Sequence, residues 1–314
     1  MEENRSLRVG IAQISPVWLL REPTFDKQLN WIQTAAEEGC GLVVFGEAMS
    51  PGYPFWIEHT DGARFESGLQ KELYAHYWKQ AVDVQAGELQ RIVDAAKQHE
   101  IAVVSGIIER DSSSARSVYS SLVAIDSKGE IQTIHRKLMP TYEERLVWST
   151  GDGHGLKTWP LPPFQAGGLN CWENWMPLAR TALYAQAEDL HMALWPGNVR
   201  NTELITPFQA REGRSFALAA SGLMRVGDIP DGIPHADMLK ELMPEQSADR
   251  GSAIAGPDGK WIVEPQAEEE KLLVADLDHD RVLEERQNFD PAGHYSRPDV
   301  LTLSVDRSRQ STLQ

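Results

Sequence analysis

The sequence predicts an α/β fold in which buried strands alternate with longer helices. Continuous apolar runs such as GLVVFG (residues 41–46) and IAVVSGII (residues 101–108) indicate strands that are buried on both faces. Between them lie longer stretches with apolar residues at helical spacing, for example residues 25–38. Because each element must bury its apolar face, this alternation predicts layers of helices packed on sheets.

The order of elements follows from the same patterns. The expected strands cover residues 7–14, 41–46, 101–108, 118–125, 131–136, 167–170, 192–195, 251–254, 260–263 and 271–276. The expected helices cover residues 25–38, 71–82, 88–99, 178–188 and 206–220. Because no Gly/Ser-rich linker or charge block divides the chain, we expect one domain over residues 1–300. Residues 301–314 are expected to be a polar tail that extends from the body or packs on a partner.

The charge balance excludes some classes of partner. The chain has 314 residues, enough to bury a large core without disulfides or metals. It carries 46 acidic and 30 basic residues, and its formal net charge is -16. A field of this sign repels phosphate backbones and anionic lipid headgroups. We therefore expect no nucleic-acid partner and no membrane association.

Cysteine usage and the N-terminus predict a cytoplasmic protein. Cys40 and Cys171 form no CxxC pair, and no Cys/His cluster has the spacing of a zinc site, so no metal is expected. The opening MEENRSLRVG lacks an apolar signal segment, and no apolar run is long enough to span a membrane. Thiols stay reduced in the cytosol, so both cysteines are expected to be free.

Reactive side chains follow three of the predicted strands. Glu47, Lys137 and Cys171 each come directly after such a strand. Strand ends that point into a crevice are where α/β proteins place their sites. Taken singly, however, a carboxylate here is more often a turn or cap residue, and a lysine is more often solvated.

The two cysteines differ in their surroundings. Cys171 lies in GGLNCWEN, which indicates a strand, a sharp turn and then a helix. A helix N-terminus favours the thiolate form of a cysteine at such a turn. Cys40 precedes a buried strand and is expected to be an inert small apolar residue.

Together these segments resemble the nitrilase (carbon–nitrogen hydrolase) superfamily, whose invariant triad is Glu, Lys and Cys in that chain order. Glu47, Lys137 and Cys171 match the triad in order and spacing, and Glu144 matches the second glutamate of the family. The resemblance extends from LRVGIAQISP to GHYSRPDVL. HRKLMPTYEERLVW followed by GDG, and GGLNCWEN followed by MPLAR, are typical of the nitrilase branch. One departure is LPPFQA (residues 161–166), which replaces the usual Gly-Lys/Arg-Val turn.

The resemblance implies an architecture and an assembly. The expected fold is a four-layer α-β-β-α sandwich. Two such units pack through helices into a homodimer, which nitrilases often extend into a spiral filament. Residues 272–278 and the tail after Gly293 would lie at these interfaces.

The resemblance also implies a reaction. A small-molecule nitrile would be hydrolysed to a carboxylic acid and ammonia without a metal or organic cofactor. Cys171 would attack the nitrile carbon after Glu47 takes its proton, forming a thioimidate and then a thioester. Lys137 would stabilise the charge that develops on nitrogen. Glu144 would hold Lys137 and the substrate in register.

Substrate-binding residues are less strongly indicated. Tyr53 follows Glu47 in an aromatic run and Trp172 adjoins the nucleophile, so both are expected to contact the substrate. Core packing is an equally common role for such rings. His135 and His294 are expected to be structural, because the family's chemistry requires no histidine.

Three alternatives remain at this stage. An aliphatic amidase is disfavoured by the Trp in CWEN, and a cyanide hydratase or dihydratase more often carries His where Asn174 stands. A catalytically silent filament or scaffold protein would have no reason to keep Glu47, Lys137, Glu144 and Cys171. The preference among aromatic, arylaliphatic and aliphatic nitriles is left open.

Overall fold

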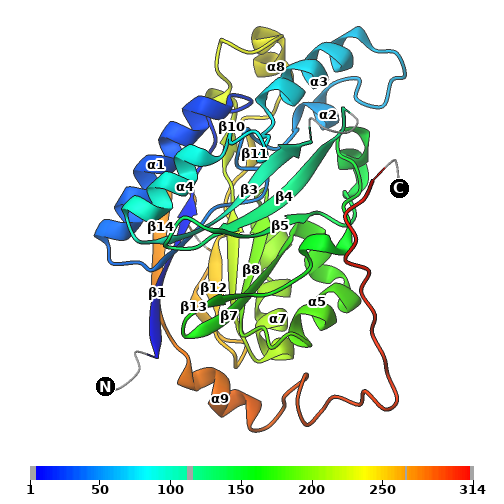
Figure 1. Cartoon of the computed structure of the whole chain (residues 1–314). Helices are drawn as coiled ribbons and strands as arrows, with labels where there is room; N and C mark the ends of the chain where they lie inside the picture. Colours follow the sequence, from blue (N-terminus) through cyan, green and yellow to red (C-terminus); the bar gives the residue numbers. More distant parts are fainter. Residues whose placement is uncertain (1–4, 112–115, 266, 312–314) are drawn as a thin grey trace.

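The computed structural model describes residues 5–111, 116–265 and 267–311. Within them, two six-stranded sheets pack face to face, and helices cover the outer face of each (Figure 1). The layers therefore run α-β-β-α, which confirms the architecture implied by the resemblance.

The first sheet has the strand order β14-β1-β2-β3-β4-β5. Its strands are β1 (Ser6–Gln13), β2 (Leu42–Val44), β3 (Ala102–Arg110), β4 (Val118–Ile125), β5 (Ile131–Arg136) and β14 (Lys271–Asp278). Helices α1 (Arg21–Glu37) and α4 (Gln90–Gln98) pack on its outer face. The sheet is mixed, because β1, β2 and β3 are parallel while β14, β4 and β5 run antiparallel to their neighbours.

The second sheet has the order β13-β12-β9-β8-β7-β6. Its strands are β6 (Trp159–Leu161), β7 (Phe164–Asn170), β8 (Leu190–Trp195), β9 (Phe216–Ser221), β12 (Ala253–Ala255) and β13 (Trp261–Val263). Helices α5 (Pro177–Tyr184) and α7 (Ile205–Gly213) form its outer layer. The remaining elements are α2 (Trp56–His59), α3 (Gly68–Gln80), α6 (Val199–Thr202), α8 (Ala236–Leu242), α9 (Asp280–Arg286), and the strand pair β10 (Met224–Arg225) and β11 (Gln246–Ala248).

Alternate residues of the central strands are buried in different layers. Leu42 and Val44 point into the core between the two sheets, whereas Val43 and Phe45 point into the core beneath α1 and α4. Side chains alternate across a strand, so a strand covered on both faces needs apolar residues at every position. Each fully buried side chain of this kind contributes roughly 1.5–3 kcal/mol. This double burial explains the unbroken apolar runs.

One predicted element is wrong. The sequence predicts a single helix over residues 206–220, but α7 ends at Gly213 and residues 216–221 form strand β9. Arg214 adopts the left-handed conformation with φ 48°, which terminates the helix. The following FALAAS has high helix propensity because it is rich in alanine. Pairing with β8 and β12 on both sides overrides that local preference.

The unusual LPPFQA segment is a hairpin. Leu161, the last residue of β6, pairs with Phe164, the first residue of β7, and Pro162 and Pro163 form the two-residue connection between them. The segment therefore supplies an edge strand beside β7, the strand that leads to Cys171. Proline lacks a backbone N–H, and it is tolerated at such an edge because no further strand there needs that donor.

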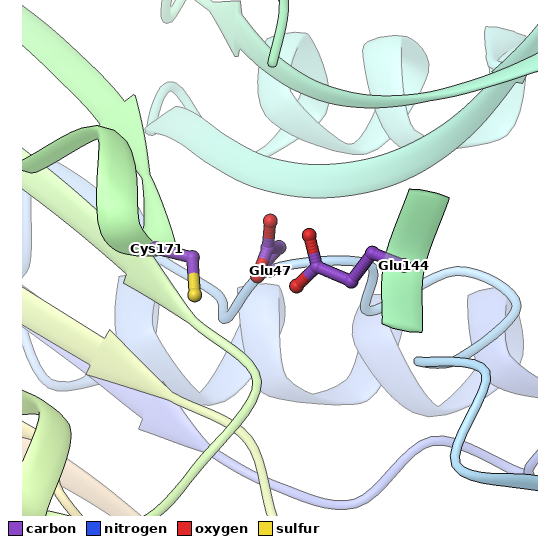
Figure 2. Close-up of side chains that lie close together, drawn as sticks. All are labelled: Glu47, Glu144 and Cys171. Carbon is purple, nitrogen blue, oxygen red and sulfur yellow. The ribbon is translucent and has the colours of Figure 1, made fainter. Parts of the chain in front are cut away.

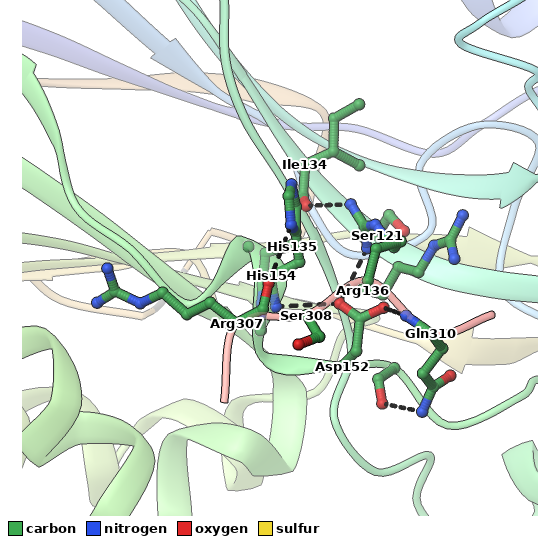
Figure 3. A network of polar contacts seen from close by, with 12 residues as sticks. Ser121, Ile134, His135, Arg136, Asp152, His154, Arg307, Ser308 and Gln310 are labelled. Carbon is green, nitrogen blue, oxygen red and sulfur yellow. Dashed lines mark hydrogen bonds and ion pairs between the residues drawn. The ribbon is translucent and has the colours of Figure 1, made fainter. Parts of the chain in front are cut away.

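The described part of the C-terminal tail contacts the loop around Asp152 of the same chain (Figure 3). The Asp152 carboxylate accepts hydrogen bonds from the Gln310 backbone N–H at 3.0 Å and from Arg309 Nη1 at 3.1 Å. Gly151, next to Asp152, donates its backbone N–H to the carbonyl of Lys137 at 2.7 Å. The tail thus braces the loop that supports the end of β5.

Close backbone packing places Glu47 where the two sheets meet. A Cβ at Gly46 would lie less than 3.0 Å from the carbonyl of Trp195 at the end of β8, and one at Gly106 would lie as close to the backbone of Glu47. The Glu47 backbone N–H donates to that Trp195 carbonyl at 3.1 Å. Only glycine allows backbones to approach so closely.

No helix in the described ranges is both long enough and apolar enough to cross a membrane.

We expect Gly106→Ala to lower the free energy of unfolding by about 1–3 kcal/mol, because the new methyl group must displace the backbone that carries Glu47. Gly227→Ala is the matched control, since its Cβ would meet no atom within 4 Å. Thermal and urea unfolding of both variants measure the difference. Equal stability of the two would contradict the packing described here.

Candidate active site

Four predicted side chains converge at the ends of the strands. Glu47 follows β2, Lys137 follows β5, Cys171 follows β7, and Glu144 lies on a short 3-10 helix over Tyr142–Leu146. In Figure 2, Glu47 lies between Cys171 and Glu144, with the Glu144 carboxylate directed toward it. One carboxylate oxygen of each glutamate and the Cys171 sulfur all lie within 4.8 Å of one another. The cluster is buried, with each of the four residues no more than 3% exposed.

A sharp turn presents the Cys171 thiol. Cys171 has φ 50°, in the left-handed region that residues other than glycine rarely adopt. It directly follows β7 and begins a short 3-10 helix over Cys171–Trp175, with α5 starting at Pro177. The Asn174 side-chain amide donates to the Cys171 carbonyl at 2.8 Å and holds the turn in this conformation. At this strained turn the Cys171 sulfur lies within 4.8 Å of a carboxylate oxygen of Glu47 and of Glu144.

Lys137 lies between the two glutamates. Its Nζ is 2.8 Å from Glu47 Oε1 and donates to Glu144 Oε2 at 2.7 Å. The ring of Trp148 lies 5.3 Å from Nζ on another side. An ammonium this deeply buried requires compensating negative charge, and both carboxylates supply it.

The two oxygens of Glu47 differ in their contacts. Oε1 receives both Lys137 and the Ser120 hydroxyl, which donates at 3.1 Å. Among the described residues, buried Oε2 has no hydrogen-bond partner. A carboxylate oxygen left without a donor is an available acceptor for a proton from a thiol or a water.

Glu144 is fixed by donors on both oxygens. Besides Lys137, Oε2 accepts the Thr141 backbone N–H at 2.6 Å. The Tyr53 hydroxyl lies 2.9 Å from Oε1 of Glu144 and 3.0 Å from Oε1 of Glu143. The structure therefore places Tyr53 beside the cluster, with its hydroxyl engaged by the two glutamates.

The pKa shifts follow from burial in a charged cluster. Burial raises the pKa of Glu47 to about 7, although Lys137 acts to lower it. Burial also raises the pKa of the Cys171 thiol well above its usual value, because Lys137 offsets burial and the two glutamates only in part. Burial disfavours charge on Lys137, but Cys171, Glu144 and Glu47 outweigh it and raise the pKa of the ammonium.

These shifts correct one expectation. The turn at the start of a helix was expected to favour the Cys171 thiolate, whereas burial beside two carboxylates favours the neutral thiol. Glu47, with a pKa of about 7, is suited to exchange a proton with that thiol near neutral pH. The arrangement therefore brings a thiol, a carboxylate of raised pKa and a fixed positive charge close together.

The same three donor atoms have the spacing of a metal site. Glu47, Glu144 and Cys171 could each offer one ligand atom. However, the Lys137 ammonium contacts both carboxylates and supplies the positive charge that a metal ion would bring. The donor set therefore fits an ammonium better than a second, metallic cation.

A cavity of about 610 Å³ adjoins the cluster through Glu143. Its lining includes Ile57, Glu58, Tyr142 and Leu146. Burial and a hydrogen bond with Glu143 raise the pKa of Glu58 to about 7. A larger cavity of about 910 Å³ lies against β13 and β14 and contains none of the predicted site residues.

Trp172 is not part of the buried cluster. Its side chain is 48% exposed and stacks on Trp175, with ring centroids 6.1 Å apart. Trp172 directly follows the nucleophile, but the turn at Cys171 directs its ring toward the surface.

Sequence reasoning missed two buried partners of the site. Ser120 lies inside β4, and no local signal distinguishes its hydroxyl from any other strand serine. The Glu173 carboxylate accepts hydrogen bonds from the backbone N–H groups of Leu138 and Asn170. The sequence does hold a signal for this residue, because a glutamate three residues after Asn170 has the spacing of a helix capping box.

Comparison with known proteins assigns the family. The model of the carbon-nitrogen hydrolase family matches residues 8–287. A prokaryotic protein named nitrilase 2, of unknown source organism, is 36% identical over 312 residues, which cover 99% of this chain and 96% of that protein. An aliphatic nitrilase from Rhodococcus rhodochrous is 33% identical, and the match covers 98% of this chain and 84% of that protein. The chain therefore belongs to the carbon-nitrogen hydrolase family.

A solved structure shares the fold. An amidase from Nesterenkonia sp. superposes with a TM-score of 0.65 over 90% of this chain and 94% of its own, at 19% identity. Identity this low supports the shared architecture alone.

The charges around Cys171 predict opposite effects on its reactivity. At pH 8 we expect Lys137→Met to slow alkylation of Cys171 by iodoacetamide, because Lys137 lowers the pKa of the thiol. Glu144→Gln should accelerate alkylation, because Glu144 raises that pKa. A pKa change of about one unit would alter each rate about tenfold.

Mass spectrometry of the Cys171 peptide measures both rates. Cys40 provides an internal control, because its pKa is raised by burial and is affected by Arg8, Glu38 and Asp276 rather than by this cluster. Rates that change in the same direction in both variants would contradict the electrostatic account.

Proposed function

We propose that this protein is a nitrilase that converts a nitrile and two water molecules into a carboxylic acid and ammonia. The observation that carries the proposal is the buried contact of a thiol, two carboxylates and a lysine, in which Lys137 Nζ lies 2.7–2.8 Å from both carboxylates. The nitrilases to which the chain is 33–36% identical over nearly its whole length support the same chemistry.

Attack on the nitrile begins with proton transfer. Glu47 takes the Cys171 proton on its unpartnered Oε2 as the sulfur bonds to the nitrile carbon. Negative charge then develops on the nitrile nitrogen, and the Lys137 ammonium stabilises it. Return of the proton to that nitrogen gives a neutral thioimidate. Because charge forms only as the bond forms, a fixed ammonium stabilises the transition state more than the neutral substrate.

Hydrolysis of the thioimidate uses the same residues. Glu47 removes a proton from the first water as the water oxygen adds to the carbon, and passes that proton to the nitrogen. The hydroxyl proton of the tetrahedral intermediate then moves to the nitrogen, which leaves as ammonia, and the carbonyl of a thioester forms. A second water, activated in the same way, releases the carboxylic acid and restores the thiol. Glu144 keeps Lys137 in place throughout, because its own two oxygens are held by Thr141 and Tyr53.

Two aromatic residues are proposed to contact the substrate, because of where they lie relative to the cluster. The Tyr53 hydroxyl contacts both Glu144 of the cluster and Glu143, which lines the cavity of about 610 Å³, so Tyr53 is proposed to contact a substrate that enters through this cavity. Trp172 is proposed as a second contact, since its half-exposed ring directly follows the nucleophile.

A panel of aromatic, arylaliphatic and aliphatic nitriles, with the corresponding amides and cyanide, tests the function. We expect ammonia release from at least one organic nitrile and a covalent adduct on the Cys171 peptide. Cys171→Ala should abolish both. Activity should fall as the pH drops through about 7, because protonated Glu47 cannot act as a base. Cys40→Ala is the control and should retain turnover.

Unchanged nitrile hydrolysis in Cys171→Ala would refute the proposal. Turnover of amides alone, or of cyanide alone, would replace the nitrilase assignment with an amidase or a cyanide hydratase.

We also propose that the protein assembles as a homodimer, or as a larger spiral built from it, through the outer layer of the second sheet. Large apolar side chains are exposed on the turn after Cys171 and on the α5–α7 layer: Trp175, Met176, Leu178, Leu204 and Phe208. Leu178 is 67% exposed and Leu204 is 68% exposed. Exposed apolar groups of this size, gathered on one layer, favour contact with another protein surface.

We expect Leu178→Asp to reduce the mass of the assembly in sedimentation or light scattering, because a buried, unpaired carboxylate opposes association. Leu242→Asp on α8 is the control, since Leu242 is also exposed but lies outside this face. A parent chain that is monomeric at micromolar concentration would refute the assembly.

A further inference from the structure

The proposed reaction does not use Glu173, although this buried acid is close in sequence to Cys171. It is 1% exposed and lies two residues after Cys171, on the 3-10 helix that carries the nucleophile. Its side chain points toward β5 rather than toward the Glu47–Lys137–Glu144 cluster, as its hydrogen-bond partners show. A buried carboxylate is costly unless its oxygens are satisfied, so its partners indicate its role.

The carboxylate joins two backbone segments that carry reactive groups. Oε1 accepts the backbone N–H of Leu138, the residue after Lys137, at 2.5 Å. Oε2 accepts the backbone N–H of Asn170, the residue before Cys171, at 2.9 Å. A single side chain therefore links the end of β5 in one sheet to the end of β7 in the other.

His135 sets the orientation of this carboxylate. Its Nε2 lies 3.2 Å from both oxygens of Glu173, and the ring is buried. An ionised carboxylate only accepts hydrogen bonds, so Nε2 carries the proton. Burial acts to raise the pKa of Glu173, but His135 and the two backbone donors outweigh it and hold the pKa below its usual value. Glu173 is therefore an ionised acceptor with a fixed geometry.

We propose that Glu173, oriented by His135, is a positioning residue that sets the spacing between the Cys171 thiol and the Lys137 ammonium. This inference rests on the roles proposed above for Cys171 and Lys137. The two groups come from different sheets, so no single strand or helix fixes their separation. A displacement of about 1 Å at reacting groups can cost about 100-fold in rate, which makes a direct link between their backbones consequential.

A capping role alone would have a different signature. The Asn170–Glu173 bond also closes the start of the short helix, and loss of a cap lowers stability without changing the chemistry. The contact with Leu138 is the part that capping does not require, because Leu138 lies outside that helix.

Glu173→Gln separates the two roles. Glutamine has one acceptor oxygen, so it can satisfy only one of the two backbone donors, while its volume is unchanged. We expect kcat for the best nitrile to fall about 10- to 100-fold with KM within twofold of the parent. The pH profile of Cys171 alkylation should move to higher pH, since a displaced Lys137 stabilises the thiolate less.

Glu88→Gln is the control for a structural loss. Glu88 also accepts a backbone N–H, from Asp83 at 2.7 Å, and it pairs with Arg21 and Arg110 away from the cluster. This variant should lose stability but keep kcat and the alkylation profile of the parent. A Glu173→Gln protein with parental kcat and profile, or a Glu88→Gln protein with the same kinetic defect, would overturn the proposal.

Variants of His135 keep the test decisive if Glu173→Gln fails to fold. His135→Gln can place an N–H donor near the position of Nε2 and should keep kcat within about twofold of the parent. His135→Leu removes the donor and should lower kcat roughly tenfold at unchanged KM. Equal kcat in the two His135 variants would also overturn the proposal.

Alkylation separates this inference from the proposed function. The reaction of Cys171 with iodoacetamide needs no substrate, so a shift in its pH profile reports the spacing even in a chain that hydrolyses no nitrile. A parent without nitrile turnover would refute the nitrilase assignment alone, whereas an unshifted profile in Glu173→Gln would refute the positioning role alone.

Discussion

The burial of Lys137 between two carboxylates is the interaction on which the rest of the site depends. Moving an ammonium out of water costs several kcal/mol, and contacts of 2.8 Å to Glu47 and 2.7 Å to Glu144 compensate for it. Removal of either partner from such a group leaves an unpaired buried charge, which typically costs about 3–5 kcal/mol. The three side chains therefore hold one another in place, and together they create the field that acts on Cys171.

That field acts on the protonation of both Cys171 and Glu47. Two carboxylates and burial keep Cys171 neutral at rest, while Lys137 only partly opposes them. The same burial raises the pKa of Glu47 to about 7, which leaves this carboxylate able to accept a proton near neutral pH.

The scaffold is built to fix these groups from several directions. Glycines let the Glu47 segment approach the end of β8, and the loop after Lys137 is braced by the C-terminal tail. The Cys171 turn is held on one side by Glu173 and on the other by Asn174, whose Oδ1 contacts buried His191 at 2.8 Å. Since Cys171 has φ 50°, these bonds maintain a backbone conformation that would relax without them.

The sequence by itself indicated the candidate site residues and most of the fold. Apolar runs marked the doubly buried strands β2 and β3, and β4 and β5 could also be predicted with their observed bounds. Glu47, Lys137, Glu144 and Cys171 could be predicted from their match to a known family, whereas the contacts of Ser120 and Glu173 could not. Tertiary structure decided the features that depend on residues far apart in the sequence. Pairing on both sides made FALAAS a strand against its helical propensity, and burial made the Cys171 thiol neutral where the turn alone favoured a thiolate. Hydrogen bonds between the sheets, such as those of Glu173, also form only when distant segments meet. The physical reason is the same in each case, because strand pairing and burial depend on neighbours that are remote in the chain.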